Sequence, residues 1–350
     1  MSIKAYGAYS CDAPLEEMTF IRRKPGVKDI QIEIIYCGVC HSDLHTVRSE
    51  WQGTLYPCVP GHEIIGRISA MGEEVTSFKI DDIVGVGCMV DSCQSCCSCN
   101  SGDEQYCENG FKLTYNSPCE DPPGHTLGGY SQRIVVDEKF VLRVRHSTEQ
   151  LAAAAPLLCA GITTYSPLRH WNAGPGKKIG IVGIGGLGHM GIKFSHALGA
   201  YTVAFTTSEN KYHDAKKLGA DEVIVTKNSD EAKKHIGSFD FILDTAGSSH
   251  DLNYYTALLK RDGVLCLVGL PENPHPSPDV GPLIFGRKSI AGSLIGGIRE
   301  TQEMLDFCAD KGITCDIELI PIQEINEAYE RMLSSDVKYR FVIDMASLKN

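Results

Sequence analysis

A glycine-rich turn between an apolar strand and a helix constrains the fold of this chain most. The segment GIVGIGGLGHMG (180–191) spaces Gly183, Gly185 and Gly188 as G-x-G-x-x-G. Around it, continuous apolar runs alternate with amphipathic ones, which predicts a parallel sheet covered by helices on both faces. The runs predict strands over 177–185, 201–208, 221–226, 239–247, 264–270 and 289–297, and helices over 188–200, 210–220 and 252–263.

The position of the turn gives it a chemical meaning. Glycines after a strand let the backbone approach a pyrophosphate, and the following helix offers N–H donors and the positive end of its dipole. We therefore predict a dinucleotide site rather than a turn that only packs tightly. NAD-selective sites usually carry a carboxylate at the tip of the next strand, but here the tip is Thr206, Thr207 and Ser208, with Lys211 nearby. Hydroxyls and an ammonium suit a 2′-phosphate, which favours NADP; the alternative is that Glu209 turns inward and binds NAD.

The remaining parts of the chain have a different pattern. Residues 1–150 consist of short β-branched runs punctuated by Gly, Asp or Pro, which predicts a barrel-like all-β domain. Residues 149–168, rich in Ala and Leu, predict a helix. From about 296 the pattern predicts helices over 300–312 and 322–336 and strands over 316–322 and 339–345. The pattern alone leaves open which domain this tail joins.

Composition excludes several classes of function. The net charge of −11 and a pI near 5.6 argue against nucleic acid as a partner, since phosphate binding needs a basic face. No apolar run is long enough to cross a bilayer, and the first ten residues lack the pattern of a signal peptide. We therefore expect a cytoplasmic protein. Its 15 cysteines are then more typical of metal binding than of disulfides.

Five of these cysteines crowd into DSCQSCCSCNSGDEQYC (91–107). Cys93, Cys96, Cys99 and Cys107 are spaced C-x2-C-x2-C-x7-C, and four thiolates on one short loop can surround a tetrahedral zinc ion. An iron–sulfur cluster is the rival interpretation, but the spacing fits neither ferredoxin pattern. Cys97 is left outside the ligand set. A closed four-ligand site leaves no position for substrate, so it predicts a structural role.

A second set of ligand-type residues is scattered along the chain. Cys40 lies in YCGVCHSDLH (36–45), His62 and Glu63 lie in VPGHEIIG (59–66), and Cys159 lies in LLCAGITTYS (157–166). Two cysteines and one histidine with an open fourth position form the catalytic zinc arrangement of alcohol dehydrogenases. Each cysteine alone would be interpreted as a buried apolar residue, and Ser and Asp after a strand as turn chemistry.

Together these segments resemble the zinc-dependent medium-chain alcohol dehydrogenases, in the cinnamyl-alcohol-dehydrogenase-like branch that includes bacterial broad-range aldehyde reductases. The resemblance covers essentially the whole chain and depends on CGVCHSDLH, YPCVPGHEIIG, the four-cysteine lobe, GGYSQ, PLLCAGITTYSPL, GIGGLGHMG and GSLIGG. It implies an α/β plus all-β fold: a GroES-like catalytic domain with an inserted Rossmann domain. The implied ranges are 1–155 with a zinc lobe at about 88–110, 156–295 for the Rossmann domain, and 296–350 returning to the catalytic domain.

The resemblance also implies roles for single residues. Cys40, His62 and Cys159 match the catalytic zinc ligands, Glu63 the acidic neighbour, and the four lobe cysteines the structural zinc ligands. Ser42 and His45 match a proton relay, and Asp43 the partner of the ligating histidine. The residues that match cofactor contacts are Thr163, Gly183, Gly185, Gly186, Leu187, Gly188, Thr207, Ser208, Lys211, Val268, Gly269, Ser293 and Ile295.

From this we expect two zinc ions per chain, NADP(H), and a homodimer that reduces aldehydes reversibly to primary alcohols. Plant members carry a Trp after the zinc lobe where Leu113 stands here, which argues against a dedicated lignin-precursor role; Trp51 offers another aromatic wall. Two other classes stay open. One is a zinc-free quinone oxidoreductase, which should lack both cysteine sets. The other is a non-catalytic cofactor-binding protein, which would not require Cys40, His62, Cys159 and Ser42 together.

Overall fold

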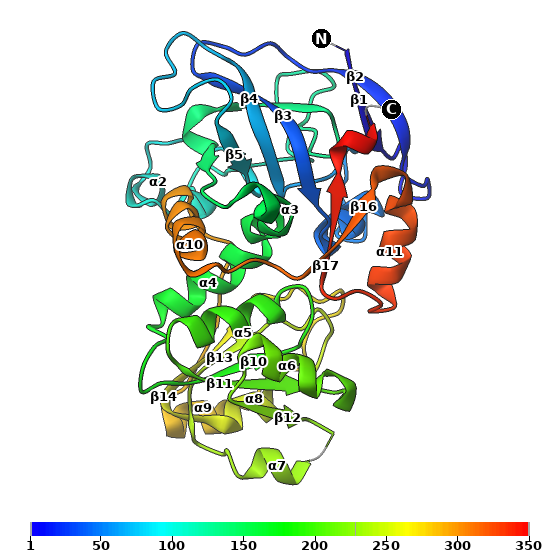
Figure 1. Ribbon diagram of the computed structural model, residues 1–350. Coiled ribbons are helices and arrows are strands. Elements are labelled where there is room, and N and C mark those ends of the chain that lie inside the picture. The colour runs from blue at the N-terminus through cyan, green and yellow to red at the C-terminus, as the bar shows by residue number, and fades with distance from the viewer. Residues whose placement is uncertain (1, 228, 349–350) are drawn as a thin grey trace. The chain divides into compact units, whose positions relative to one another are not determined.

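The chain folds into two compact units in the computed structural model, which describes residues 2–227 and 229–348 (Figure 1). Unit 1 comprises Met1–Ile162 and Gly296–Asn350, and unit 2 comprises Thr163–Ile295. The first division thus falls after Ile162, later than the expected boundary at 155/156. Met1, Asn228, Lys349 and Asn350 lie outside the described residues.

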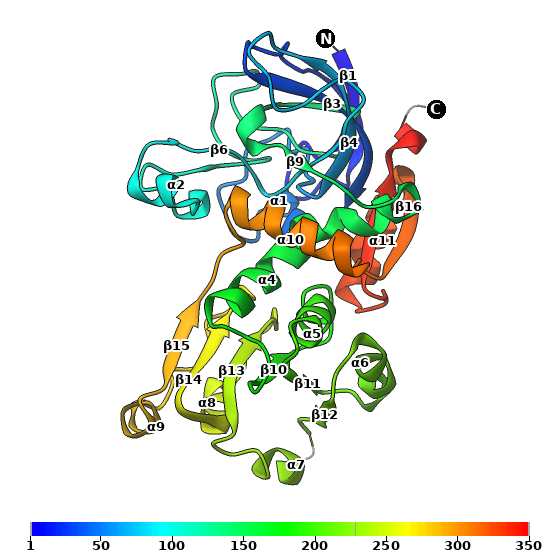
Figure 2. The same cartoon turned by 60° about the vertical axis from the view of Figure 1, so that its left-hand side comes forward.

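Unit 2 is built on a six-stranded parallel sheet in the order β12-β11-β10-β13-β14-β15. Figure 2 shows α5 and α6 on one face of this sheet and α8 on the other. The doubly covered parallel sheet predicted from alternation is therefore confirmed. The strands are β10 (Lys178–Val182), β11 (Tyr201–Thr206), β12 (Glu222–Val225), β13 (Phe239–Asp244), β14 (Leu259–Leu267) and β15 (Ser289–Gly292), and the helices are α5 (Gly188–Ala197), α6 (Tyr212–Leu218), α7 (Ser229–Lys233), α8 (Leu252–Leu258) and α9 (Val280–Gly286).

The core of unit 2 lies between the sheet and α8. Phe205 and Phe239 are fully buried, with ring centroids 5.5 Å apart, and Tyr255 meets Phe205 edge to face. The β-branched and aromatic residues of the strands supply most of this cluster. The burial fixes the strands, so the polar turns at their carboxyl ends are held along one edge.

Unit 1 contains a seven-stranded sheet in the order β16-β17-β3-β4-β5-β9, with β8 paired to β3, and two small sheets, β1-β2 and β6-β7. Short helices and turns that carry polar residues interrupt it. The strands are β1 (Ser2–Gly7), β2 (Glu16–Ile21), β3 (Asp29–Gly38), β4 (Ile64–Met71), β5 (Ile83–Val86), β6 (Met89–Asp91), β7 (Lys112–Leu113), β8 (Arg133–Asp137), β9 (Leu142–Arg143), β16 (Ile317–Pro321) and β17 (Arg340–Asp344). The α-helices are α1 (His41–Val47), α2 (Cys97–Ser101), α3 (Leu151–Ala154), α4 (Ala160–His170), α10 (Ile298–Lys311) and α11 (Ile325–Leu333), with α4 crossing into unit 2.

The C-terminal tail joins unit 1. Strand β17 pairs antiparallel with β3, with Val342 opposite Gly38 and Asp344 opposite Tyr36, and β16 extends the sheet. The two expected helices and two expected strands of the tail are present as α10, α11, β16 and β17. This pairing brings residues 340–344 beside the segment that leads to Cys40.

Two local predictions are wrong, and one helix was not predicted. The expected helix over 149–168 is broken: α3 passes into a 3-10 turn, Ala155–Leu158, and the backbone turns sharply at Cys159 before α4 begins. Pro156 explains the break, because it lacks the N–H that a continuous helix would need. The expected helix over 252–263 ends at Leu258, since Leu259 is buried and pairs with Phe239 as the start of β14. Residues 41–47, for which no helix was predicted, form α1.

Among residues 2–227 and 229–348, no single helix is long and apolar enough to cross a membrane. One bent pair, Thr148–Leu158 with Ala160–His170, passes by length and composition only.

Candidate functional site

Four buried side chains from three separate segments of unit 1 meet at one point. Cys40 is the N-cap of α1, His62 and Glu63 precede β4, and Cys159 occupies the break before α4. Their ligand atoms all lie within 4.8 Å of one another, and the two sulfur atoms are 3.9 Å apart. Two thiols, one imidazole and one carboxylate at this spacing suit a zinc ion. The fold thus assembles the set that the sequence could only suggest.

Local backbone geometry explains how Cys40 and His62 are aimed. The Asp43 side chain accepts a hydrogen bond from the backbone N–H of Cys40 (2.9 Å), which closes a capping box at the start of α1. The same carboxylate accepts from the backbone N–H of Gly61 (3.1 Å) and faces Nδ1 of His62 (3.1 Å). Asp43 is fully buried, so it ties the two metal-site segments together.

The environment of His62 leaves its other ring nitrogen available to a metal. Burial lowers the pKa of His62, but the Asp43 carboxylate, together with Cys88 and Cys40, outweighs burial and raises that pKa well above its usual value. With Nδ1 hydrogen-bonded to Asp43, Nε2 is the ring nitrogen that could bind a metal, and a metal there would displace the ring proton. Tyr115 stacks on the same ring, with centroids 5.7 Å apart.

A buried arginine from the tail completes this site, and sequence reasoning missed it. Arg340, at the start of β17, donates Nη2–H to the Glu63 carboxylate and lies 3.9 Å from the Cys40 sulfur through Nη1. Burial raises the pKa of Glu63 to about 8, and the nearby Arg340 charge opposes that rise. A hydrogen bond from Cys159 and then the charge of Arg340 lower the pKa of Cys40, which favours the thiolate that zinc prefers.

The predicted relay residues lie on α1. The Ser42 hydroxyl is 3.6 Å from the Cys40 sulfur. Nδ1 of His45 pairs with the carboxylate of Glu50, and the His45 ring contacts Trp51 at 5.0 Å between centroids. Glu50 was not predicted. Trp51 is 40% exposed, and Leu113, on β7, is also exposed.

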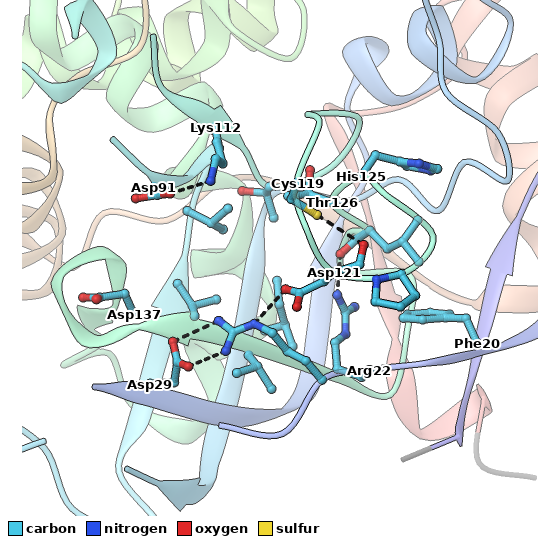
Figure 3. A pocket seen from close by; sticks show the side chains of 18 of the residues that line it. Phe20, Arg22, Asp29, Asp91, Lys112, Cys119, Asp121, His125, Thr126 and Asp137 are labelled. Atoms are coloured by element: carbon cyan, nitrogen blue, oxygen red, sulfur yellow. Dashed lines mark hydrogen bonds and ion pairs between the residues drawn. The ribbon is translucent and has the colours of Figure 1, made fainter. Parts of the chain in front are cut away.

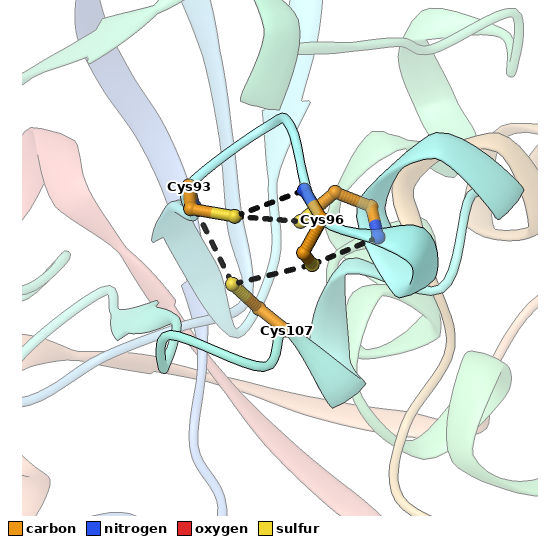
Figure 4. A group of neighbouring side chains, drawn as sticks. Cys93, Cys96 and Cys107 are labelled. Atoms are coloured by element: carbon orange, nitrogen blue, oxygen red, sulfur yellow. Dashed lines mark hydrogen bonds between the residues drawn. The ribbon is translucent and has the colours of Figure 1, made fainter.

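The four lobe cysteines form a second cluster, in which all four sulfur atoms lie within 4.8 Å of one another; Figure 4 labels three of them. Backbone N–H groups of Cys96 and Cys99 donate to the sulfurs of Cys93 (3.3 Å) and Cys96 (3.5 Å), as they would to thiolates. Hydrogen bonds from the Ser95 backbone and the Asn109 side chain lower the pKa of Cys93 to about 5. Cys97 is exposed and lies outside the cluster.

Two contacts join this lobe to α10. The Glu104 carboxylate accepts from the backbone N–H of Ile298 (2.9 Å), and Arg299 donates to the carbonyl of Ser101 (2.5 Å). Glu104 thereby caps the helix N-terminus, where an acidic group is stabilising. A change in the conformation of the lobe would therefore also disturb the start of α10.

The glycine turn in unit 2 has the geometry of a phosphate-binding loop. Gly188 admits no side chain, because its Cβ would overlap the Gly183 carbonyl oxygen. At Gly185, by contrast, a Cβ would meet none of the described residues within 4 Å. Protein packing therefore does not explain glycine at this position, whereas close approach of a pyrophosphate does. The glycine turn therefore has room for the pyrophosphate of a dinucleotide.

The tip of β11 borders a cavity of about 570 Å³, lined by Thr207, Ser208, Glu209, Asn210, Val225 and Lys227. Lys211 does not line it; its Nζ donates to the Ile184 carbonyl (2.9 Å). Lys227 was not predicted, although the parallel pairing of Thr206 with Val225 brings the two strand ends together.

The other expected cofactor residues belong to unit 2 as well. Thr163 is buried on α4, and Val268 and Gly269 follow β14, where their N–H groups donate to the Asp244 carbonyl. Ser293 follows β15. Ile295 has φ of +35°, which is strained for a β-branched residue and is typical of functional sites.

Unit 1 holds another cavity, of about 280 Å³, shown in Figure 3. None of the predicted site residues lines it. Its charges pair with one another: Arg23 with Asp29 and Asp121, and Lys112 with Asp91. We assign no ligand to it.

The geometry defines a dehydrogenase with one Cys2His metal site and one dinucleotide loop, and comparisons identify the class. Residues 26–146 match the family described as alcohol dehydrogenase GroES-like domain, and residues 186–310 match that described as zinc-binding dehydrogenase. The chain belongs to the zinc-dependent medium-chain alcohol dehydrogenase family, and the predicted GroES-like plus Rossmann fold is confirmed.

Individual relatives indicate to which branch of the family the chain belongs. The chain is 66% identical to aldehyde reductase YahK of Escherichia coli over 99% of each chain. Among solved structures it is similar to cinnamyl alcohol dehydrogenase of Sorghum bicolor (TM-score 0.94, 40% identity, 99% of this chain and 98% of that one). It is equally similar in sequence to CAD of Helicobacter pylori complexed with NADP(H) (TM-score 0.91, 40% identity, 99% of each chain). The predicted cinnamyl-alcohol-dehydrogenase-like branch is confirmed.

Proposed function

We propose that this protein is a zinc-dependent, NADP(H)-dependent oxidoreductase that interconverts aldehydes and primary alcohols and acts mainly as a broad-range reductase of aromatic and aliphatic aldehydes. The observation that carries the proposal is the convergence of Cys40, His62 and Cys159 from three segments into one buried cluster. The names of the relatives, an aldehyde reductase and a dehydrogenase bound to NADP(H), support it. Both cysteine sets are present, which disfavours a zinc-free quinone oxidoreductase, and the assembled site disfavours a non-catalytic protein.

In the proposed mechanism, Cys40, His62 and Cys159 would hold a catalytic zinc ion, and Cys93, Cys96, Cys99 and Cys107 would hold a structural one. Bound zinc supplies Lewis-acid polarisation of a carbonyl oxygen, and bound NADPH supplies the hydride. Glu63 stays hydrogen-bonded to Arg340 beside the metal site.

Proton supply falls to the residues of α1. The Ser42 hydroxyl lies beside the Cys40 sulfur and donates the proton that completes the alcohol. His45, on the same helix, would return a proton to Ser42 when the cofactor is bound, and Glu50 holds the His45 ring by its Nδ1–H. Asp43 fixes the tautomer of His62 through its contact with Nδ1.

The choice of NADP(H) is proposed from the cavity at the tip of β11. Thr207 and Ser208 offer hydroxyl donors to a 2′-phosphate, and Lys227 offers a positive charge from the neighbouring strand end. Lys211 contributes through the glycine turn, which it braces at Ile184. Glu209 also lines the cavity and would oppose a phosphate unless it turns outward.

The decisive experiment measures initial rates with benzaldehyde and with butanal, with NADPH and with NADH, in both directions, together with zinc content. We expect reduction of both aldehydes, a kcat/KM for NADPH at least about tenfold above that for NADH, and two zinc ions per chain. A preference for NADH would refute the cofactor assignment. Quinone reduction without zinc, or no turnover by the zinc-loaded protein, would refute the reaction class.

We also propose a homodimer formed through β15 and α9. Strand β15 is an edge of the six-stranded sheet, and edges present unpaired backbone groups. On α9, which lies near it in sequence, Ile284 and Phe285 are 72% and 94% exposed. Two copies related by a twofold axis would cover both features. Sedimentation should give a dimer, and Phe285→Asp should give a monomer; a wild-type monomer would contradict the proposal.

A cytoplasmic location is proposed from cysteine chemistry. All 15 cysteines are free, and the ligand clusters need thiolates rather than disulfides, which suits a reducing compartment. Fractionation of cells that produce the protein tests this, with recovery outside the cytosolic fraction as the contrary result.

A further inference from the structure

An ion pair between a partly exposed histidine and a buried aspartate lies at the cofactor edge of unit 2 and has no role in the chemistry described so far. Asp244 is the last residue of β13, and its side chain is 2% exposed. Nε2 of His250 lies 2.8 Å from the Asp244 carboxylate, and Nδ1 lies 2.8 Å from the carbonyl oxygen of Ser248. Both ring nitrogens face acceptors, so both must carry a proton for the two hydrogen bonds to form.

The other groups around His250 also favour its charged form. The hydrogen bond to Asp244 raises the pKa of His250, burial opposes this, and the Ser248 carbonyl and the Asp251 carboxylate add to it. Asp251 begins α8, and Tyr255 of the same helix meets the His250 ring edge on. From the segment before α9, the His275 ring packs at 4.7 Å between centroids. The Asp244 and Asp251 carboxylates thus both favour the charged form of the His250 ring.

Asp244 also lies at the junction of the strand ends that we assign to the cofactor. Its carboxylate accepts from the backbone N–H of Ala246 (3.1 Å), and its carbonyl accepts from Val268 (3.0 Å) and Gly269 (3.4 Å). A Cβ on Gly269 would overlap the Ala246 carbonyl oxygen, so the two segments touch. The turn between Asp244 and His250 is therefore fixed to the end of β14.

The same turn reaches the phosphate-binding loop. Between Asp244 and Ala246, Thr245 donates its hydroxyl to the Val182 carbonyl (2.7 Å). A Cβ on Gly183 would lie 3.2 Å from that hydroxyl oxygen. A shift of the turn would consequently move the first glycine of the loop.

We propose that His250 is a positioning residue for the dinucleotide: its positive charge neutralises the buried Asp244 carboxylate beside the cofactor phosphates and holds residues 245–250 against the glycine loop. The inference rests on the proposed use of NADP(H). Its physical basis is that an unpaired buried carboxylate would repel a polyanionic cofactor and would be costly to keep desolvated.

A double-mutant cycle tests the charge directly. NADPH dissociation constants are measured by fluorescence titration of the full-length, zinc-loaded protein and its variants. We expect His250→Ala to weaken binding about tenfold, because Asp244 is left without its counter-charge. Adding Asp244→Asn should restore binding to within about threefold of wild type, since the amide oxygen still accepts from Ala246 without a charge. The inference is overturned if His250→Ala binds NADPH like wild type. It is also overturned if the double variant binds NADPH no more tightly than His250→Ala.

Two further variants separate charge from packing. His250→Gln keeps a hydrogen-bond donor without the charge and should bind nearly as weakly as His250→Ala; wild-type affinity here would overturn the charge assignment. His275→Ala removes a ring that packs against His250. It removes no partner of Asp244, so the NADPH affinity should change by less than about twofold. Because each variant is titrated as a folded protein checked by thermal unfolding, a loss of folding is recognised as such.

The pH dependence gives an independent readout. His250 is charged below its raised pKa, so NADPH affinity should be highest at low pH and fall as pH rises through that pKa, with the fall absent in Asp244→Asn. A fall of equal size in both proteins would contradict the inference. A wild type that binds only NADH would refute the NADP assignment and leave the cycle to be run with NADH, whereas a wild type that binds neither would overturn both proposals.

Discussion

Single residues define the metal sites by their chemical type, but their surroundings decide what each one does. Six of the 15 cysteines have a proposed ligand role: Cys40 and Cys159 in the catalytic cluster and four in the lobe. The other nine, Cys97 among them, have none. Of these nine, Cys37 and Cys266 are buried, as Cys159 is. A free cysteine behaves as a small apolar residue unless other ligands surround it. The neighbours, and not the thiol, therefore mark Cys159 as a ligand.

Replacing Cys159 with Ala should remove the catalytic zinc and leave the lobe zinc in place. We expect zinc content to fall from two to one per chain, and kcat/KM for aldehyde reduction to fall by more than about 100-fold, since loss of even an outer partner of a metal ligand costs up to that much. Metal analysis and initial rates measure both. Cys266→Ala, an equally buried thiol of unit 2, is the control. Retention of two zinc ions by Cys159→Ala would show the ligand assignment to be wrong.

The Arg340–Glu63 pair makes a prediction about stability. Both side chains are buried (4% and 0% exposed), so Arg340→Gln would leave the Glu63 carboxylate without its partner. We expect the free energy of unfolding to fall by about 3–5 kcal/mol at pH 9, above the Glu63 pKa of about 8, where this carboxyl is ionised. Adding Glu63→Gln should recover much of that loss, because no uncompensated charge then remains. Urea unfolding measures both variants, and a double variant no more stable than the single one would argue against the pair.

At the scale of elements, the sequence predicted the alternation of unit 2 well, because buried parallel strands are apolar throughout and their periodicity is local. It did not predict where three elements begin or end. Pro156 breaks the expected helix over 149–168, and Leu259 enters β14 because Phe239 offers it a buried partner. Tertiary packing overrides local propensity at such boundaries.

The glycine loop allows a matched pair of substitutions within one element. Gly188→Ala places a methyl group against the Gly183 carbonyl oxygen and should destabilise the protein by about 1–3 kcal/mol. Gly185→Ala meets open space, so stability should change by less than about 0.5 kcal/mol. Because that space is assigned to pyrophosphate, Gly185→Ala should nevertheless weaken NADPH binding at least about tenfold. Thermal unfolding and fluorescence titration separate the two effects; unchanged NADPH affinity in Gly185→Ala would refute the assignment.

At the scale of the whole molecule, the two cysteine clusters should separate stability from catalysis. Cys99→Ser should lose one zinc ion and lower the unfolding temperature by at least about 5 °C, since the lobe then no longer holds Glu104 against the start of α10. At low temperature, where the protein stays folded, kcat/KM should stay within about threefold of wild type. Calorimetry and assays at 15 °C test this prediction. If Cys99→Ser lost its activity while its unfolding temperature stayed unchanged, the lobe would take part in the reaction itself.

The sequence by itself determined the ligand types, the glycine loop and the architecture of unit 2, because these depend on spacing within a few residues or on local periodicity. Only the tertiary structure brought Cys40, His62 and Cys159 within ligand distance, since they are separated by up to 119 positions along the chain. It alone placed Arg340 behind Glu63 and His250 beside Asp244, because burial and charge pairing depend on neighbours that local sequence does not specify. The tail shows the same limit: its helices and strands were predictable, but its place in unit 1 follows from the pairing of β17 with β3.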